Sequence, residues 1–314
     1  MNLVQYLHMK NDDKFAYFLK TRFITNRTPK YWVNWDNVMS NMQEHELNLN
    51  TLNYLVGKDN IKEIAYKLFQ QQPQLLKSIP ILLASRDLKM DVLTLEKDNK
   101  MSTYTVDFSH PDLHKLNQYL DFMEETGLLH FLSKGLKESL VDYLLGVQVG
   151  LDTNGRKNRS GAQNELILSR NLKAITKFNS NLEFITQATA KNIESHWRIK
   201  VPEMLQSGKK GGRRYDGAVY NTKQDSVTII ETNFYGSGGS KLKAVAGEFM
   251  SLYETSLKDT SNVKFVWISD GPGWDQAKNP LREAFDVIPT IINLHMVKSG
   301  MLEEIILANK MMML

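Results

Sequence analysis

The stretches Arg213–Val219 (RRYDGAV) and Val227–Asn233 (VTIIETN) are two short apolar runs separated by the polar segment Asn221–Asp225. Apolar runs of this length around turn-forming residues predict the two strands of a β-hairpin. Asp216 stands near the start of the first run and Glu231 near the end of the second. Because the strands of a hairpin are antiparallel, we expect the two carboxylates to lie side by side at one end of it.

Two neighbouring carboxylates repel each other, and a divalent cation relieves that repulsion. Carboxylate and carbonyl oxygens are hard ligands of the kind that Mg²⁺ takes together with substrate phosphate and water. Asp216 and Glu231 are therefore the predicted metal ligands, with the main-chain carbonyl of Thr232 as a third. A water molecule whose pKa the metal lowers can attack a phosphodiester. The hairpin thus predicts a Mg²⁺-dependent phosphodiesterase, in which Mn²⁺ can replace Mg²⁺.

An acid, a hairpin and a second acid followed by a polar residue two positions later form the pattern of the PD-(D/E)XK nucleases. The chain resembles the DpnII-type (MboI-like) restriction endonucleases in four stretches. These stretches are RRYDGAVY at 213–220, ETNFYGSGGSKL at 231–242, GLDTNGRKNRSG at 150–161 and PILLASR at 80–86. The resemblance implies an α/β fold, namely a restriction-endonuclease-like core with a mixed sheet flanked by helices, and a largely helical N-terminal part.

The resemblance also implies an activity. DpnII-type enzymes are type II restriction endonucleases that cut both strands of DNA at GATC when its adenine is unmethylated. They act as homodimers, and a partner DNA adenine methyltransferase protects the host genome. A two-fold symmetric dimer fits a palindromic site, because the symmetry of the protein matches that of the DNA sequence.

The third position of the nuclease pattern departs from the usual lysine. Asn233 stands there, and an amide can position a water molecule but carries no charge. DpnII-type enzymes resemble this chain in having an amide at this place. Lys241, at the start of the next predicted helix, could restore the positive charge. Alternatively, the amides of Gly236–Gly239 could bind phosphate at that helix terminus.

Composition limits the classes of protein. With 314 residues the chain can bury a large core, as one elaborated domain or two. It has no cysteine, which excludes disulfides and thiolate zinc sites and fits a cytoplasmic protein. No apolar run reaches about 18 residues, so no membrane partner is expected.

The net charge is only +4, but its distribution is uneven. Between Asp152 and Arg214 thirteen Lys and Arg residues face five Asp and Glu residues. A basic zone beside a candidate metal site is expected of a protein that binds a phosphate backbone, although a solvated charged face gives the same pattern. The segment 150–161 is read as a loop, either a linker or a contact with base edges. The predicted DNA-contacting residues are Asn154, Arg156, Lys157, Asn158, Arg159, Lys209, Lys210, Arg213 and Arg214.

Two regions are predicted, a helical region over 1–149 packed on the core and a nuclease core over 150–314. In the first region apolar spacing predicts a helix over 59–71 and two helices over 111–149, broken near Gly127 or Ser133. In the second, helices are expected over 161–178 and 240–255, with a buried strand over 262–269.

Glu165 lies early in the helix predicted over 161–178. PD-(D/E)XK folds commonly carry an extra acid on the helix before the core sheet, and Glu165 stands where that acid would be. An acid near a helix N-terminus is also favourable to the helix dipole by itself.

Two other functions stay open from the sequence alone. The first is a different nuclease with this core, such as a repair or junction-resolving enzyme that recognises DNA structure. The second is a DNA-binding module without catalysis, for which the basic zone would suffice.

Overall fold

The computed structural model describes residues 1–95, 101–202, 212–258 and 262–309. Its contacts divide the chain into two compact units, which we describe separately. The sheet unit comprises Met1–Thr28 and Lys157–Leu314, and the helical unit comprises Pro29–Arg156. The sequence placed Met1–Thr28 with the helical region instead, and the domain boundaries stay a prediction. No helix among the described residues has both the length and the apolar character needed to cross a membrane.

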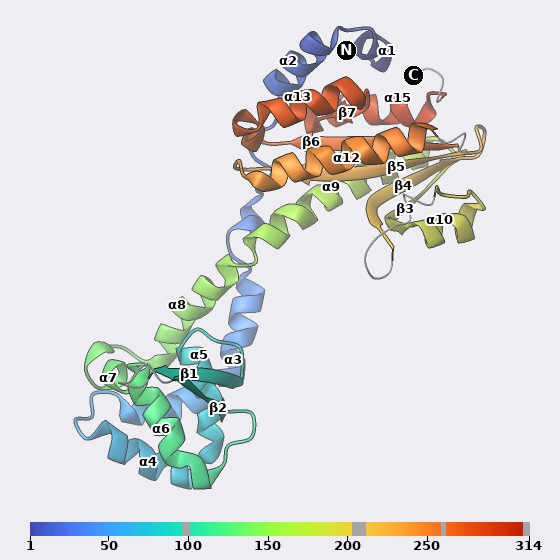
Figure 1. Ribbon diagram of the computed structural model, residues 1–314. Helices are drawn as coiled ribbons and strands as arrows, with labels where there is room; N and C mark the ends of the chain where they lie inside the picture. Colours follow the sequence, from blue (N-terminus) through green and yellow to red (C-terminus); the bar gives the residue numbers. More distant parts are fainter. Residues whose placement is uncertain (96–100, 203–211, 259–261, 310–314) are drawn as a thin grey trace. The chain divides into compact units, whose positions relative to one another are not determined.

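A five-stranded mixed sheet forms the centre of the sheet unit (Figure 1). Its strands lie in the order β3–β4–β5–β6–β7, with β3, β4 and β5 antiparallel and β5, β6 and β7 parallel. Their bounds are β3 (Leu182–Thr189), β4 (Arg214–Asn221), β5 (Ser226–Phe234), β6 (Val263–Asp270) and β7 (Ile291–Ile292). All eight residues of β6 are buried, as expected of a parallel strand covered on both faces. The strand predicted over 262–269 and the mixed sheet are therefore confirmed.

The hairpin of β4 and β5 is also confirmed. Its register pairs Gly217 with Ile230 and Asn221 with Ser226. At the turn the Asn221 side chain accepts a hydrogen bond from the main-chain N–H of Lys223 at 3.1 Å, and Asp225 adopts a positive φ of 45°. Asn and Asp favour tight turns because their side chains accept such hydrogen bonds and because they tolerate a positive φ.

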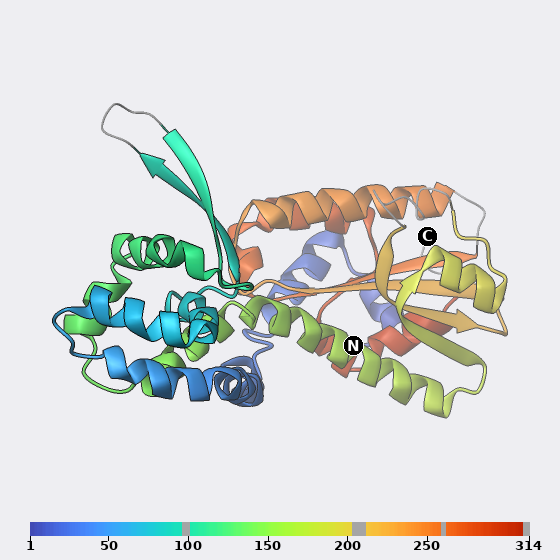
Figure 2. The same ribbon diagram turned by 90° about the horizontal axis from the view of Figure 1, so that it is seen from below.

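Helices cover both faces of the sheet. In Figure 2, α12 and α9 lie on opposite sides of it. Phe249 of α12 packs against the rings of Phe265 and Trp267 on one face. On the other face, a Cβ at Gly217 would come within 3.1 Å of Leu172 of α9. Among its described residues, the helices of this unit are α1 (Leu3–Leu7), α2 (Asn11–Thr21), α9 (Arg156–Phe178), α10 (Ala190–Trp197), α12 (Ser240–Lys258), α13 (Lys278–Val287), α14 (Leu294–Lys298) and α15 (Met301–Leu307), with a 3₁₀ turn η6 (Pro272–Gln276).

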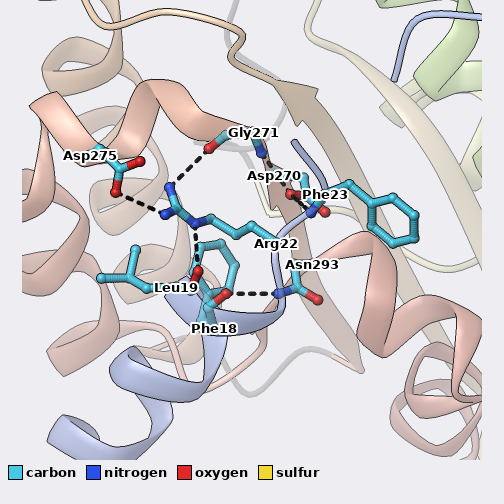
Figure 3. Close-up of polar contacts among 8 residues, drawn as sticks. All are labelled: Phe18, Leu19, Arg22, Phe23, Asp270, Gly271, Asp275 and Asn293. Atoms are coloured by element: carbon cyan, nitrogen blue, oxygen red, sulfur yellow. Dashed lines mark hydrogen bonds and ion pairs between the residues drawn. The ribbon is translucent and has the colours of Figure 1, made fainter. Parts of the chain in front are cut away.

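Asp270 ties the N-terminal segment to the end of β6 (Figure 3). Its fully buried carboxylate accepts hydrogen bonds from the main-chain N–H groups of Phe23 at 2.8 Å, Gly271 at 2.7 Å and Leu294 at 2.9 Å. Burial raises the pKa of this carboxyl to about 6, although the three N–H donors oppose that rise. The segment that follows α2 is thereby fixed to the sheet.

The Arg22 guanidinium makes a second set of contacts at the same place (Figure 3). It donates to the carbonyls of Leu19 and Gly271 at 3.1 Å and 3.0 Å, and to the Asp275 carboxylate at 2.9 Å. A few residues further on, the Asn26 side chain donates to Asn164 of α9 at 3.0 Å. The N-terminal segment thus contacts both the end of β6 and the helix that carries Glu165.

The helical unit has its own apolar core. Its helices are α3 (Trp35–Leu52), α4 (Ile61–Gln71), α5 (Ile79–Leu82), α6 (Leu116–Glu125), α7 (Leu128–His130) and α8 (Leu140–Thr153). Short turns follow the 3₁₀ or π pattern at η1 (Pro29–Tyr31), η2 (Asn53–Leu55), η3 (Pro73–Ser78), η4 (Leu113–Lys115) and η5 (Phe131–Gly135). The helix expected over 59–71 is confirmed, as is the break near Gly127, whose φ is 78°.

An antiparallel ribbon of β1 (Lys89–Leu95) and β2 (Met101–Asp107), which was not predicted from the sequence, lies in the same unit (Figure 2). The loop predicted over 150–161 is also wrong. Residues up to Thr153 continue α8, and α9 begins at Arg156. Polar residues do not exclude a helix where its surface faces solvent, and Arg, Lys, Gln and Ala all favour one.

Candidate active site

Asp216 and Glu231 meet at the end of the hairpin. The ladder pairs Gly217 with Ile230, so Asp216 and Glu231 are the next opposed residues beyond it. The Asp216 carboxylate accepts a hydrogen bond from the main-chain N–H of Thr232 at 2.7 Å. Side chains of opposed residues project from the same face of an antiparallel pair. The structure therefore brings together the two acids that the sequence singled out.

Burial disfavours the charged forms of both acids, and at Glu231 the charge of Asp216 adds to this effect. Glu231 is only 7% exposed, and burial followed by the charge of Asp216 raises its pKa to about 8. Burial also raises the pKa of Asp216, and the Thr232 N–H opposes this by stabilising the carboxylate. Without a cation the pair tends to retain a proton. A divalent cation at this place would compete with that proton.

Arg213 is a cation held directly against Glu231. Its Nη2 and Nε donate to one carboxylate oxygen of Glu231 at 3.1 Å and 3.3 Å, and its Nη1 donates to Glu248 of α12. The guanidinium also lies over the rings of Tyr215 and Phe249, at 5.5 Å and 5.4 Å from their centroids. From the sequence, Arg213 was expected to contact DNA only, and its ion pair with Glu248 could not be foreseen because the two residues are 35 positions apart.

Glu165 stands on α9 with an exposed side chain. Its carboxylate accepts a hydrogen bond from Nε2 of Gln187 at 2.9 Å, and its charge contributes to the raised pKa of Asp216. Glu165 thus acts electrostatically on Asp216. Within the described ranges no three His, Asp or Glu side chains gather closely enough to hold a metal ion, so a metal here would rest on two carboxylates and other oxygens.

Asn233 and Thr232 follow Glu231 along β5. The Asn233 side-chain oxygen accepts a hydrogen bond from the indole N–H of Trp267 at 2.9 Å, which fixes the orientation of its amide. Lys241 lies in the first turn of α12 and is exposed. Among the residues that the structure describes, its ammonium group has no carboxylate partner.

The glycine-rich segment after β5 packs closely on the end of β6. A Cβ at Gly271 or Gly273 would come within 2.3 Å or 2.8 Å of the Tyr235 carbonyl oxygen. That carbonyl accepts a hydrogen bond from the Gly273 N–H at 2.8 Å. Glycine is therefore required at both positions, and the chain that follows the candidate ligands is held by main-chain contacts.

The predicted DNA-contacting residues stand in different settings. Arg156 donates from Nε to the carbonyl of Trp32 at 3.1 Å and lies over its ring, so part of its surface is already used. Arg159 is partly buried. Arg213 is also partly buried, in the ion pair described above, whereas the side chains of Asn154, Lys157, Asn158 and Arg214 are exposed. Lys209 and Lys210 lie outside the described residues.

Comparison with known proteins identifies the family. A family model described as DpnII restriction endonuclease matches residues 14–304. The type II restriction enzyme LlaDCHI of Lactococcus lactis subsp. cremoris is 45% identical over 305 residues, which are 97% of this chain and 98% of that protein. The type II restriction enzyme DpnII of Streptococcus pneumoniae is 32% identical over 95% of this chain and all of its own. MboI of Moraxella bovis is 34% identical over 93% of this chain and 95% of its own. No solved structure matches. The chain belongs to the DpnII restriction endonuclease family.

Proposed function

We propose that this type II restriction endonuclease cuts both strands of DNA at GATC, with Asp216 and Glu231 as the metal ligands of its active site. The single observation that carries the site assignment is the meeting of the buried carboxyl of Glu231 and the partly buried carboxyl of Asp216 at the end of the β4–β5 hairpin. GATC specificity and a requirement for unmethylated adenine are inferred from the resemblance to DpnII-type enzymes.

The donor set fits a hard divalent cation. Asp216 and Glu231 supply two carboxylates, and the carbonyl of Thr232 is a candidate third ligand. Restriction enzymes of type II generally use divalent metal ions, and oxygen ligands alone favour Mg²⁺, with Mn²⁺ as a substitute. When bound, the metal supplies Lewis-acid activation of water and neutralises charge on the phosphate.

Other residues then have defined tasks. The Asn233 amide, oriented by Trp267, can donate from its NH₂ group to position the attacking water. Positive charge near the scissile phosphate can come from Arg213 or, as the sequence suggested, from Lys241. Glu165 adds a third negative charge at the site. The exposed basic side chains of Lys157 and Arg214 are candidates for contact with the phosphate backbone.

The order of elements supports a PD-(D/E)XK core. The chain runs from β4 to β5, then α12 and β6, which is the strand–strand–helix–strand order of that core. α9 precedes the sheet in the chain and carries Glu165. The additional acid of PD-(D/E)XK folds commonly stands on the corresponding helix. A homodimer reading a palindromic site, and a partner methyltransferase that protects the host, complete the proposal.

Plasmid cleavage tests this proposal. Plasmid DNA with and without adenine methylation at GATC is incubated with the protein in Mg²⁺ or in EDTA. We expect discrete fragments with GATC at their ends, from unmethylated DNA only and in Mg²⁺ only. Asp216→Asn should abolish cleavage. Asp225→Asn is the matched control, because Asp225 lies at the opposite end of the same hairpin and Asn tolerates its positive φ.

The outcomes separate the alternatives. Fragments with other ends would retain the nuclease and reject GATC. Cleavage that depends on branched or damaged DNA would favour a repair or junction-resolving enzyme. Intact DNA in every reaction, with binding still visible by gel shift, would leave a DNA-binding module. Cleavage by Asp216→Asn at the wild-type rate would reject the site assignment.

A further inference from the structure

Gln187 interrupts the pairing of β3 with β4 beside the candidate site. Thr186 pairs with Gly217 and Ala188 with Tyr215, and between these pairs Gln187 and Asp216 stand opposite each other outside the ladder. Gln187 has a φ of 52°, in the left-handed region that residues other than glycine seldom occupy. The strand therefore departs from regular geometry next to one of the two proposed metal ligands.

This backbone conformation is unusual for its place. The described part of the chain has three other non-glycine residues with positive φ, namely Ala84, Arg198 and Asp225. Arg198 is the C-cap of α10, Asp225 lies in the β4–β5 turn and Ala84 follows α5, all common places for left-handed backbone. Gln187 alone of the four lies inside a strand. Such strain persists only where the surroundings enforce it, and it is frequent at functional sites.

The side chain of Gln187 reaches Glu165. Its Nε2 donates to the Glu165 carboxylate at 2.9 Å, although the two residues belong to different elements, β3 and α9. Glu165 is exposed, whereas Gln187 is partly buried, so the amide is the better fixed of the two partners. The charge of Glu165 acts in turn on Asp216. Gln187 thus stands opposite Asp216 in register and also binds the third acid.

We propose that Gln187 is a positioning residue, which holds the Glu165 carboxylate toward Asp216 by means of its left-handed backbone conformation. This inference rests on the proposed role of Asp216 and Glu231 as metal ligands. The neutral amide suits the task. A lysine at 187 would neutralise Glu165 and a carboxylate would repel it, while an amide N–H donor holds it in place and leaves its charge unchanged.

Gln187→Gly tests the proposal, because it removes the amide and accepts the positive φ without strain. We expect a melting temperature at or above that of the wild type. Single-turnover cleavage in Mg²⁺ should slow about 10- to 100-fold, the worth of one hydrogen bond to a charged group. Glu165→Gln should slow it comparably, and the double variant should be no slower than either single one.

Arg198→Gly is the matched control for the backbone. It relieves the same left-handed conformation at an exposed helix end, and it should raise or preserve the melting temperature with no change in cleavage. A second measurement follows Mn²⁺ binding by calorimetry in the absence of DNA. Gln187→Gly and Glu165→Gln should weaken this binding by the same factor, whereas Arg198→Gly should not change it.

Wild-type cleavage and Mn²⁺ affinity in Gln187→Gly would overturn the proposal. So would rate losses that multiply in the double variant, because Gln187 would then act independently of Glu165. Asp216→Asn separates this failure from that of the proposed active site. An inactive Asp216→Asn beside a fully active Gln187→Gly rejects only the role of Gln187, while an active Asp216→Asn rejects the site itself.

Discussion

Arg213 places its guanidinium 3.1 Å from the carboxylate of Glu231, so the most buried acid of the site has a cation as its direct neighbour. The same guanidinium is also held by Glu248 and by the rings of Tyr215 and Phe249. Arg213 therefore has a defined position before any metal arrives. It offers positive charge at a site whose third motif position, Asn233, carries none.

Replacing Arg213 with Met should raise the pKa of Glu231 further, because the cation that stabilises the carboxylate is lost. A proton then competes more strongly with the metal. We expect cleavage at pH 7 to fall at least about tenfold and to recover partly at higher pH.

The pH profile of single-turnover cleavage at saturating DNA measures this. Arg214→Met is the control, since Arg214 is adjacent but exposed. It should weaken DNA binding and reduce the dependence of binding on salt, with an unchanged pH profile. Equal pH profiles for the two variants would contradict the role given to Arg213.

The stability of the metal-free protein should decrease as pH rises through the titration of Glu231. The folded chain holds a proton on this carboxyl up to about pH 8, whereas the unfolded chain releases it near pH 4.5. The free energy of unfolding therefore falls between these two values. A divalent cation replaces the proton, so the rise in melting temperature that Mg²⁺ causes should grow from pH 6 to pH 8.5.

Melting curves with Mg²⁺ or EDTA across this range provide the test. Glu231→Gln has no carboxylate to titrate, and it should lose both the fall in stability and most of the effect of Mg²⁺. If Mg²⁺ stabilised the wild type equally at every pH, the pKa of Glu231 would not be raised in the folded chain.

Asp270 should contribute more to the free energy of unfolding than Asp275, which lies five residues further along the chain. One carboxylate oxygen of Asp270 accepts from the N–H groups of Phe23 and Gly271, and the other accepts from the N–H of Leu294. In Asp270→Asn an NH₂ group would replace one of these oxygens and face the N–H groups that had donated to it. We expect a loss of about 1–3 kcal/mol in the free energy of unfolding. Asp275 is half exposed and pairs with Arg22, so Asp275→Asn should cost under about 1 kcal/mol.

Denaturant unfolding at pH 8 in EDTA compares the two variants. Hydrogen exchange should rise in Asp270→Asn either at the Leu294 amide or at the amides of Phe23 and Gly271, because the N–H groups that face the new NH₂ group lose their acceptor. Similar losses of stability in the two variants would contradict the greater contribution expected of the buried Asp270 carboxylate.

The sequence was sufficient for the hairpin and for the meeting of its acids, because turn chemistry and alternation are local. Asn221 and Asp225 mark the turn, and antiparallel pairing then sets Asp216 opposite Glu231. The strand–strand–helix–strand order could also be read from apolar periodicity. The ion pair of Arg213 with Glu248 could not, since it depends on how α12 packs on the sheet.

Two features of the structure were not predicted from the sequence, for different reasons. The ribbon of β1 and β2 has a strand signal in Thr103–Val106 (TYTV), but the helical segments around it outweighed that signal. The left-handed backbone of Gln187 has no signal at all, because glutamine does not mark positive φ. Its link to Glu165 requires the bend of β3 and the packing of α9 together.

The absence of a side chain at Gly217 should control the distance between α9 and β4. A Cβ there would come within 3.1 Å of Leu172 and 3.3 Å of Leu168, and both leucines are buried and closely packed. We therefore expect Gly217→Ala to displace α9, to cost about 1–3 kcal/mol in unfolding free energy and to slow cleavage, because α9 carries Glu165. Gly247→Ala is the control, since Gly247 lies on the exposed side of α12 with open space around it and should gain about 0.5–1 kcal/mol. Cleavage by Gly217→Ala at the wild-type rate, despite lowered stability, would mean that the position of α9 does not limit the reaction. The role of Glu165 would then have to be reconsidered.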